Sequence, residues 1–596
     1  SGRIIQDTGT GGSWPVSTDR MTWALAAWEV YAATGDRQWL TQAYEILERS
    51  VTADRHAAVD AATGLMLGES SFLDWREQSY PAWMQPADIY QSMAVGTNAV
   101  HVGAYRVGGE MARALGRDAT RWDAWRDSTA SAMNRDLWSA ADGRYAQFRY
   151  GRLASSLSRR SETLGAALAL LTGAVPQERQ RALVANTPVV AFGAPTFWPY
   201  TGGVPFYHNA TVWPFVAAFW TWAAADARHT AAVEHGLAAL ARAPALFLTN
   251  KENLVAETGH FEGTALNSDR QLWSVAGTLA AQLRVLFGLR LERDGLRFAP
   301  MVPPAYAGDR TLRGLRWRGA TLEVVVRGSG DGVRRLLLDG VPLPTAVIPS
   351  SLTGAHRVEV ELDGRWPASS VTTVADVVAP ATPGLTRAGG ALRWRAVEGA
   401  ARYVVHRGGR PVDTLSRAAR QYRLPATPRA EEWQLEAVSA DGVASFLSEP
   451  VRTVAAAAVI TAKPDSARER AYSGFSGTGY LTLAAHKGNT ARVSLRVPSA
   501  GTYALEVRYA NGNGPINTED KTALRTVRVD GRDVGVVVMP QRGGGAWSQW
   551  GWSNRLLLRL VPGVHVVELR YDALDRNMHG VINDALLDLV RLTRIE

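Results

Sequence analysis

The chain has 596 residues, no cysteine and a formal net charge of +9. This length exceeds a single domain and favours roughly four, and the absence of cysteine excludes disulfides, thiolate metal sites and a cysteine nucleophile. The positive charge comes almost wholly from arginines spread along the chain, so we expect no nucleic-acid interface, which would need a basic cluster. No apolar run reaches the length of about 18 residues that a membrane span needs.

Apolar residues at helical spacing cover most of residues 19–288. Residues 22–34 are rich in alanine and are followed by Gly35, a typical helix end. Long loops rich in glycine and aromatic residues separate alternate pairs of helices. A helical solenoid is the alternative, but it would show a repeat of fixed period, and the sequence has none. We therefore predict helical hairpins in a ring, with a site on one rim. The further predicted helices cover residues 38–51, 87–115, 118–136, 160–172, 177–185, 210–226, 229–243 and 270–287.

Beyond Gly288 apolar and polar residues alternate, which predicts antiparallel β-sheet. A linker, VVAPATPG, begins at about Val377 and divides this β region. We predict a multidomain chain in which a helical barrel precedes three β-sandwich domains. The predicted boundaries are 1–295, 296–376, 377–455 and 456–596.

The densest chemistry lies in residues 68–98, GESSFLDWREQSYPAWMQPADIYQSMAVGTN. Four carboxylates are interleaved there with five large aromatic side chains. Aromatic rings stack on the C–H faces of sugars, and paired acids protonate or activate oxygen, so this mixture is typical of a sugar-cleaving site. An aromatic loop with ordinary solvated acids is the alternative at this point.

Three segments together resemble the six-hairpin (α/α)6-barrel glycosidases, a group with trehalases, glycoside hydrolase family 63, debranching amylo-α-1,6-glucosidases and α-L-rhamnosidases. They are GESSFLDWREQSYP, YHNATVWPFVAAFWTWAAA and AETGHFEGTALNSDRQLWSVAGTLAAQLRVLFGL, in family order. Such a barrel has twelve helices, whereas nine or ten are predicted here. We therefore expect the first helices in a removed N-terminal part or on a second chain; the alternative is that the predicted helix over 87–115 is two helices merged.

The resemblance implies an inverting mechanism in which two carboxylates flank the scissile bond. Asp74 falls on the position of the general acid, and Glu257 is our choice for the general base, with Glu262 second. Asp19 could instead begin a helix, Arg76 and Glu77 could pair with each other, and a lone His260 is more often structural. The predicted contacts to the substrate are Trp14, Asp19, Arg20, Trp75, Arg76, Glu77, Trp83, Trp198, Tyr207, His208, Trp213 and His260.

The later domains have resemblances of their own. Residues 380–453 resemble a fibronectin type III module, and residues 457–596 resemble carbohydrate-binding modules of family 35 or 6. Such binding modules commonly hold a structural Ca²⁺, but the early acidic strand reads VITAKPD here, which leaves Asp588 as the one candidate ligand. The predicted sugar contacts of this module are Tyr509, Asn511, Asn513, Trp547, Trp550 and Trp552.

The resulting hypothesis is a secreted or periplasmic, exo-acting, inverting glycosidase that needs no cofactor for catalysis and acts on an oligosaccharide or polysaccharide. Its specificity for an α-glucoside or an α-L-rhamnoside stays open. The alternatives are a carbohydrate-binding protein without activity, a glycoside phosphorylase, and a polysaccharide lyase on a related helical toroid.

Overall fold

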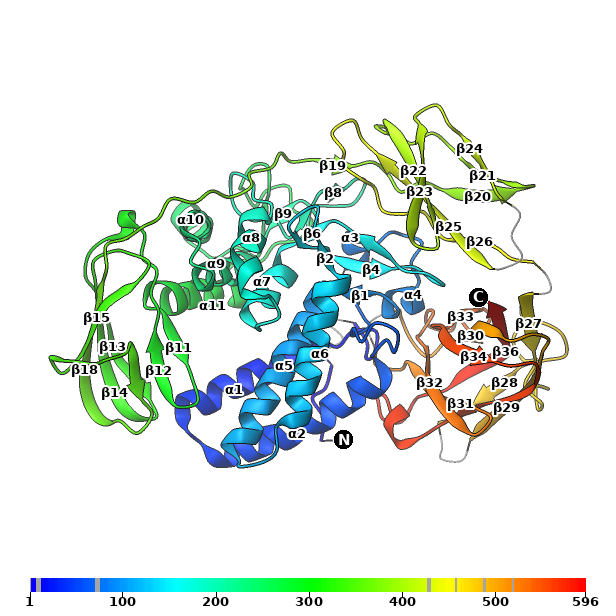
Figure 1. Cartoon of the computed structure of the whole chain (residues 1–596), viewed down its shortest axis with the longest axis horizontal. Helices are drawn as coiled ribbons and strands as arrows, with labels where there is room; N and C mark the ends of the chain where they lie inside the picture. The colour runs from blue at the N-terminus through cyan, green and yellow to red at the C-terminus, as the bar shows by residue number, and fades with distance from the viewer. Residues whose placement is uncertain are drawn as a thin grey trace.

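The computed structural model describes residues 2–6, 12–69, 75–425, 430–455, 458–485, 489–516 and 519–596. A helical unit comes first, and within these ranges three β units follow it, each built from two sheets (Figure 1). The predicted order of one helical domain and several β domains is therefore confirmed. The complete twelve-helix barrel and the domain boundaries stay predictions.

The helical unit follows the predicted helices closely. The long helices are α1 (Thr22–Thr34), α2 (Arg37–Ala57), α5 (Val95–Ala114), α6 (Thr120–Asp136), α7 (Thr163–Leu171), α8 (Gln177–Asn186), α9 (Pro214–Asp226), α10 (Thr230–Phe247) and α11 (Leu272–Ala281), which continues into the π-turn η2 (Gln282–Leu286). The helix predicted over 87–115 is instead divided into the short α4 (Pro86–Tyr90) and α5, because Met93 and Ala94 between them pair with β4 (Phe148–Tyr150).

Short elements connect the long helices and form the loops. They are η1 (Asp19–Met21), α3 (Arg76–Ser79), β1 (Met93–Ala94), β2 (Trp138–Ser139), β3 (Arg144–Tyr145), β5 (Ser156–Ser158), β6 (Ser161–Glu162), β7 (Phe197–Trp198), β8 (Tyr200–Thr201), β9 (Thr211–Val212) and β10 (Leu254–Val255).

The first hairpin shows how local sequence sets the helix ends. Gly35 adopts φ +73° after α1, and its N–H donates to the carbonyl of Tyr31. One residue later the carboxylate of Asp36 accepts hydrogen bonds from the N–H groups of Gln38 and Trp39, which begins α2. A stop signal and a start signal in adjacent residues turn the chain back on itself.

Helices α1, α5, α7, α9 and α11 pack side by side in this order. All of them contribute to the wall of a largely apolar cavity of about 530 Å³, which includes Leu25, Leu168, Phe219 and Trp273. Among the described residues no helix is both long enough and apolar enough to cross a membrane.

The first β unit runs from β11 to β18. One sheet has the order β11 (Leu289–Leu291), β12 (Gly295–Phe298), β17 (Val347–Pro349), and the 3-10 helix η3 (Pro304–Tyr306) follows β12. The other has the order β13 (Arg310–Trp317), β14 (Gly319–Arg327), β18 (Thr353–Leu362), β15 (Val333–Leu338), β16 (Val341–Pro342). The prediction of antiparallel sheet is wrong for one pair: β14 and β18 run parallel, because three strands intervene between them in the chain.

The second β unit contains β20 to β26. Its sheets are β20 (Leu385–Ala388), β21 (Ala391–Trp394), β24 (Gln421–Arg423), and β23 (Arg410–Ser416), β22 (Arg402–Arg407), β25 (Glu431–Val438), β26 (Val451–Thr453). Trp394 of β21 and Tyr403 of β22 pack in its core with ring centroids 5.6 Å apart. Before this unit, β19 (Val378–Ala379) pairs with β8 of the helical unit.

The third β unit contains β27 to β36. One sheet holds β27 (Val459–Ala462), β28 (Leu481–Leu483), β30 (Gly501–Ala510), β33 (Gly551–Trp552), β34 (Leu556–Leu560) and β36 (Ala585–Arg594). The other has the order β29 (Thr490–Val497), β35 (Gly563–Arg570), β31 (Ala523–Val529), β32 (Arg532–Met539), and η5 (Ala573–Asp575) follows β35.

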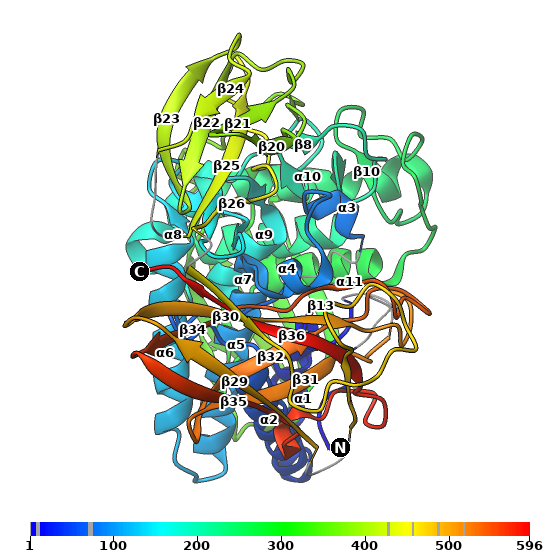
Figure 2. The ribbon, with the colours of Figure 1, turned by 90° about the vertical axis from the view of Figure 1, so that its right-hand side faces the viewer.

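The units are packed together. The hydrophobic core of the helical unit includes Phe446 and Leu447 of the second β unit and Leu524, Val536 and Val538 of the third. Figure 2 shows α3 and α4 above the strands of the third β unit. Residues of the first β unit, such as Trp317, belong to the same cluster. Because apolar side chains of all four units share one buried cluster, separating the units would expose that surface to water.

Candidate active site

The structure brings together the three segments that carry the predicted chemistry. Gln78 joins the first two: its Nε2 donates to the carbonyl of Pro205 at 2.9 Å, and its Oε1 accepts from the N–H of Asn209 at 2.9 Å. Strand β9 pairs with β10, which joins the segment around residue 211 to the segment around residue 255. Loops far apart in sequence therefore form one rim.

Tyr207 lies at the centre of this rim. Its ring centroid is 5.7 Å from that of Trp75 and 4.9 Å from that of Trp213. Its hydroxyl donates to Oε1 of Glu252 at 2.8 Å. Asp74, the predicted general acid, lies outside the described residues. Two successive contacts therefore link Trp75, its neighbour in the chain, to the carboxylate of Glu252.

Glu252 is the acid that sequence reasoning passed over. It is buried, with 6% of its surface exposed, whereas Glu257 is exposed and the side chain of Glu262 is 79% exposed. The sequence places all three acids in one loop-like segment, and nothing in their local pattern separates them. The geometry favours Glu252 over the two predicted bases, because it alone contacts the aromatic cluster through Tyr207.

An ion pair braces the base of the loop on either side of residues 70–74. Nε of Arg76 donates to Oε2 of Glu69 at 2.8 Å, and both side chains are buried. The alternative pairing of Arg76 with Glu77 is not adopted, because Glu77 points to solvent. Arg76 therefore supports the loop through its Nε, and it also borders the cavity of about 180 Å³ beside Glu77, so its predicted contact with the substrate stays a prediction.

Trp14 and Arg20 surround a buried carboxylate, Asp54. Nε1 of Trp14 and both terminal nitrogens of Arg20 donate to Asp54 at 2.8 Å, and Nε2 of His101 lies 3.3 Å from it. Burial alone would raise the pKa of Asp54, but the charge of Arg20 and the hydrogen bonds from His101 and Arg20 outweigh it and lower this pKa to about 2. Trp14 and Arg20 therefore hold the first hairpin together, which corrects their predicted contact with sugar.

Several other predicted contacts use their polar groups within the protein, although Trp83 and Trp198 are only half-buried and Trp83 borders the cavity of about 940 Å³. Nε1 of Trp83 donates to the carbonyl of Leu447 at 2.9 Å, and Nε1 of Trp198 donates to that of Ala375 at 3.0 Å. Asp19 begins η1 and is buried, as the helix-start alternative expected. These side chains join the helical unit to later parts of the chain or to its own core.

His208 and Trp213 are buried, whereas the side chain of His260 is 39% exposed. Trp213 is buried behind Tyr207. Burial lowers the pKa of His208 to about 3, so its imidazole is neutral at physiological pH. His260 stacks on Phe261, with ring centroids 4.7 Å apart, and its Nδ1 accepts the N–H of Glu262 at 3.1 Å. These contacts give His260 a structural role, and its predicted contact with the substrate stays a prediction.

In the third β unit, the predicted sugar contacts divide into two groups. Tyr509 and Asn511 are fully buried, and Asn511 donates to the carbonyls of Lys521 and Met539. Asn513 donates to the carbonyl of Asp584 at 2.9 Å. These residues shape loops, because their polar groups are used within the protein, and this corrects their predicted role.

The tryptophans of this unit remain candidates for sugar contact. Trp547 is half-buried and stacks on Tyr472 with ring centroids 5.8 Å apart and an interplanar angle of 25°. Nε1 of Trp550 donates to the carbonyl of Ser473. Trp552 is covered by the guanidinium of Arg591, 3.4 Å from its ring centroid. Trp547 is therefore the best placed of the three to offer a ring face.

Asp588, the candidate Ca²⁺ ligand, already has cationic partners. It is buried and forms ion pairs with Nζ of Lys463 and with the guanidinium of Arg508, and it accepts the N–H of Ser476 at 3.0 Å. Ca²⁺ needs six to eight oxygen ligands, and no group of three or more acidic or histidine side chains that could hold a metal occurs in the described ranges. The residues around Asp588 do not fit a Ca²⁺ site.

Two cavities flank residues 77–82. A cavity of about 940 Å³ separates this segment from the second β unit, with Arg160, Leu385 and Phe446 in its wall. A smaller cavity of about 180 Å³ lies against Ile516 of the third β unit. Glu77 borders both cavities, so it stays a candidate for substrate contact.

Part of the chain is similar to known carbohydrate-active proteins. Residues 11–206 match the family model of the bacterial α-L-rhamnosidase six-hairpin glycosidase domain. A cycloisomaltooligosaccharide glucanotransferase of Niallia circulans is 30% identical over 103 residues, 17% of this chain and 10% of that protein. An exo-β-D-glucosaminidase of Amycolatopsis orientalis is 29% identical over 133 residues, 22% of this chain and 12% of that protein.

The chain thus spans about a tenth of the length of these curated relatives. A solved family 35 carbohydrate-binding module from Cellvibrio japonicus aligns with 23% of this chain and 94% of its own, at 18% identity and a TM-score of 0.19. The predicted resemblance to six-hairpin glycosidases is confirmed by the family match, and the carbohydrate-active relatives fit it.

Proposed function

We propose, from the six-hairpin glycosidase domain that residues 11–206 match, that the chain hydrolyses a terminal glycosidic bond of an oligosaccharide or polysaccharide with inversion. One observation carries the proposal: Tyr207 contacts both Trp75, next to Asp74, and the buried carboxylate of Glu252. An inverting site needs two such carboxylates, roughly 6.5–9.5 Å apart, with a water between one of them and the sugar.

In this mechanism Asp74 protonates the glycosidic oxygen as its bond to the anomeric carbon breaks. Glu252 accepts a proton from the water whose oxygen forms the new bond to that carbon. The hydroxyl of Tyr207 holds Oε1 of Glu252, which orients Oε2 to receive the proton. The half-buried ring of Trp75 offers an apolar face to the sugar, and Glu77 offers a carboxylate to its hydroxyls.

The family model that residues 11–206 match is named for bacterial α-L-rhamnosidases, and this name sets the order in which substrates are tested. An α-L-rhamnoside is the first substrate to test, and an α-glucoside is the second. A polysaccharide substrate fits a secreted or periplasmic location, which we propose together with the activity.

The test compares three carboxylate variants on 4-nitrophenyl α-L-rhamnoside and α-glucoside. We expect Glu252→Gln to lower kcat by about 10²–10⁴, the usual contribution of a general base. Glu257→Gln and Glu262→Gln are matched controls in the same segment and should change kcat less than about threefold, because both side chains are exposed. Proton NMR of the first product anomer reports inversion or retention.

The assignment to Glu252 fails if Glu257→Gln or Glu262→Gln loses activity while Glu252→Gln keeps it. Retention of the anomeric configuration would contradict the inverting mechanism. An inactive wild type that still binds oligosaccharides would favour the non-catalytic alternative.

A further inference from the structure

A segment of the third β unit reaches the candidate active site. Ile516, on the loop that follows β30, borders the cavity of about 180 Å³ together with Glu77, Tyr80, Pro81 and Met84 of the helical unit. Ile516 is 43% exposed, so its side chain is accessible from this cavity. Residues 77–81 follow Trp75 directly, so the third β unit supplies a wall next to the proposed catalytic loop.

The loop that carries Ile516 is held in place at both ends. At its start, Asn511 donates to two backbone carbonyls and accepts the N–H of Asn513. Beyond Ile516, Oδ1 of Asp520 accepts the N–H of Trp14 at 2.7 Å, a bond between residues 506 positions apart in the chain. The bond from Trp14 to Asp520 joins this part of the third β unit to the helical unit.

The same loop adjoins the aromatic face of the third β unit. The N–H of Gly545 donates to the carbonyl of Gly512 at 2.9 Å. The Trp547 ring lies so close to Gly512 that a Cβ added there would be 2.8 Å from it. Trp547 in turn stacks on Tyr472, which is 37% exposed. One short segment therefore leads from the cavity beside Glu77 to a pair of stacked rings.

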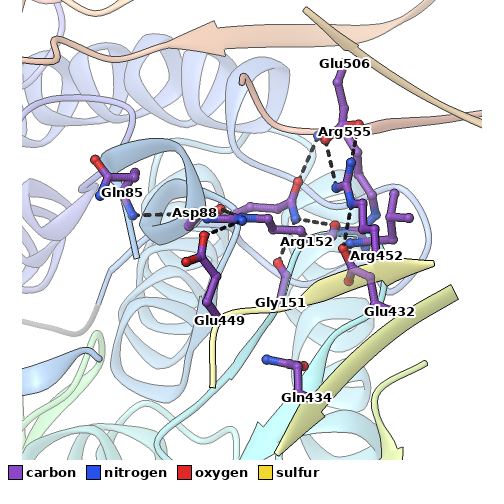
Figure 3. A network of polar contacts seen from close by, with 12 residues as sticks. Gln85, Asp88, Gly151, Arg152, Glu432, Gln434, Glu449, Arg452, Glu506 and Arg555 are labelled. Carbon is purple, nitrogen blue, oxygen red and sulfur yellow. Dashed lines mark hydrogen bonds and ion pairs between the residues drawn. The ribbon is translucent and has the colours of Figure 1, made fainter. Parts of the chain in front are cut away.

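A polar network keeps this arrangement fixed (Figure 3). Arg152 of the helical unit pairs with Asp88 and with Glu449 of the second β unit. Arg452 of the second β unit pairs with Glu506 of the third.

Arg555 completes the network. Its N–H donates to Oε1 of Gln91, and its guanidinium donates to the carbonyl of Arg152. The third β unit is thus joined to the helical unit by charged and polar contacts as well as by the shared core.

We propose that this surface is a substrate subsite: Ile516, Trp547 and Tyr472 bind sugar units of the same chain whose terminal bond lies at Glu252. The inference rests on the proposed function. Ile516 and the rings offer apolar faces suited to the C–H faces of neutral pyranose units, while Glu77 disfavours an acidic sugar beside it. The third β unit then extends the active site, and it does not bind the polysaccharide at a separate, distant site.

The experiment measures binding and turnover separately. Isothermal titration of maltoheptaose, isomaltoheptaose and a neutral rhamno-oligosaccharide into wild type and Ile516→Asp tests the subsite. We expect Ile516→Asp to weaken binding of at least one of these about tenfold, and Trp547→Ala to weaken binding of the same probe. The matched control is Val561→Asp: Val561 is also an exposed aliphatic residue of the third β unit, 63% exposed, and follows β34 at the opposite end of β30.

Turnover of aryl glycosides, which carry one sugar, should be within about twofold of wild type in Ile516→Asp, while kcat/KM on the bound oligosaccharide falls. Wild type that binds none of the three probes, or an Ile516→Asp variant that binds them as wild type does, overturns the subsite. If neither aryl glycosides nor the bound oligosaccharide is cleaved but Ile516→Asp still loses binding, the proposed function and the extension of the active site fall, and only a sugar-binding surface at Ile516 stands.

Discussion

Two buried carboxylates of the helical unit, Asp54 and Glu252, differ in how many hydrogen bonds they accept from the protein. Asp54 is surrounded by donors from three segments of the chain, Trp14, Arg20 and His101, so both of its oxygens are bonded within the protein. Glu252 has one hydroxyl donor, Tyr207, on a rim of aromatic side chains. Burial therefore does not by itself identify a catalytic acid. The distinction is whether protein donors already use the oxygens that a substrate or a water would need.

The largest effect on stability is expected at Asp54. Asp54→Asn removes the negative charge and leaves the guanidinium of Arg20 buried beside a neutral amide, which costs about 3–5 kcal/mol of unfolding free energy. Urea denaturation of wild type and variant measures the difference. Asp441→Ala, at an exposed position, is the control and should change stability by less than about 0.5 kcal/mol. An unchanged midpoint in Asp54→Asn would show that the cluster around Asp54 does not brace the fold.

A second brace is expected at Asp588, where Lys463 and Arg508 take the place of a metal. Lys463→Met leaves Arg508 and Ser476 as partners, so we expect a loss of about 1–3 kcal/mol, typical of a removed partner of a buried charge. Arg496→Met, on the exposed face of β29, is the control. Neither Ca²⁺ nor EDTA should shift the thermal midpoint of wild type. A midpoint raised by Ca²⁺ would contradict the substitution of cationic side chains for the metal.

The pH dependence of stability should also report Asp54. Its folded pKa of about 2 lies below the ordinary value of 3.8, so its contribution is fully present above about pH 4 and is lost as pH falls toward 2. A shift of this size corresponds to about 2 kcal/mol. Unfolding free energies measured between pH 5 and 2 should fall less steeply in Asp54→Asn than in wild type. Parallel curves would assign the acid sensitivity to other carboxylates, such as Glu506, whose burial opposes ionisation but whose pKa Arg452 and Arg591 lower.

The sequence predicts helices and the segments that form the rim, because apolar spacing and loop composition are local signals. It does not predict which polar side chain faces a ligand. Trp14, Trp83 and Asn511 have the residue types of a sugar site, yet their partners are Asp54, Leu447 and Met539. The partner of Trp83 lies 364 positions away in the chain. Such pairings depend on how whole units pack, which periodicity does not encode. The parallel pairing of β14 with β18 escaped prediction for the same reason.

Glu252→Gln is expected to have the smallest effect on stability and the largest effect on activity. Glu252→Gln keeps an oxygen that can accept the hydroxyl of Tyr207, so the unfolding free energy should change by less than about 1 kcal/mol, the worth of one neutral hydrogen bond. Thermal unfolding of the same preparations used for kinetics makes the comparison, with Tyr207→Phe as a matched variant that removes the donor from the other side. If Glu252→Gln destabilises the chain as strongly as Asp54→Asn, Glu252 is a second brace, and the base must be sought among the exposed acids of residues 257–262. If Glu252→Gln loses activity and keeps stability, Asp54 and Glu252 have different roles. Asp54, whose oxygens accept bonds from several protein donors, is then structural, and Glu252, which accepts the hydroxyl of Tyr207, is then catalytic.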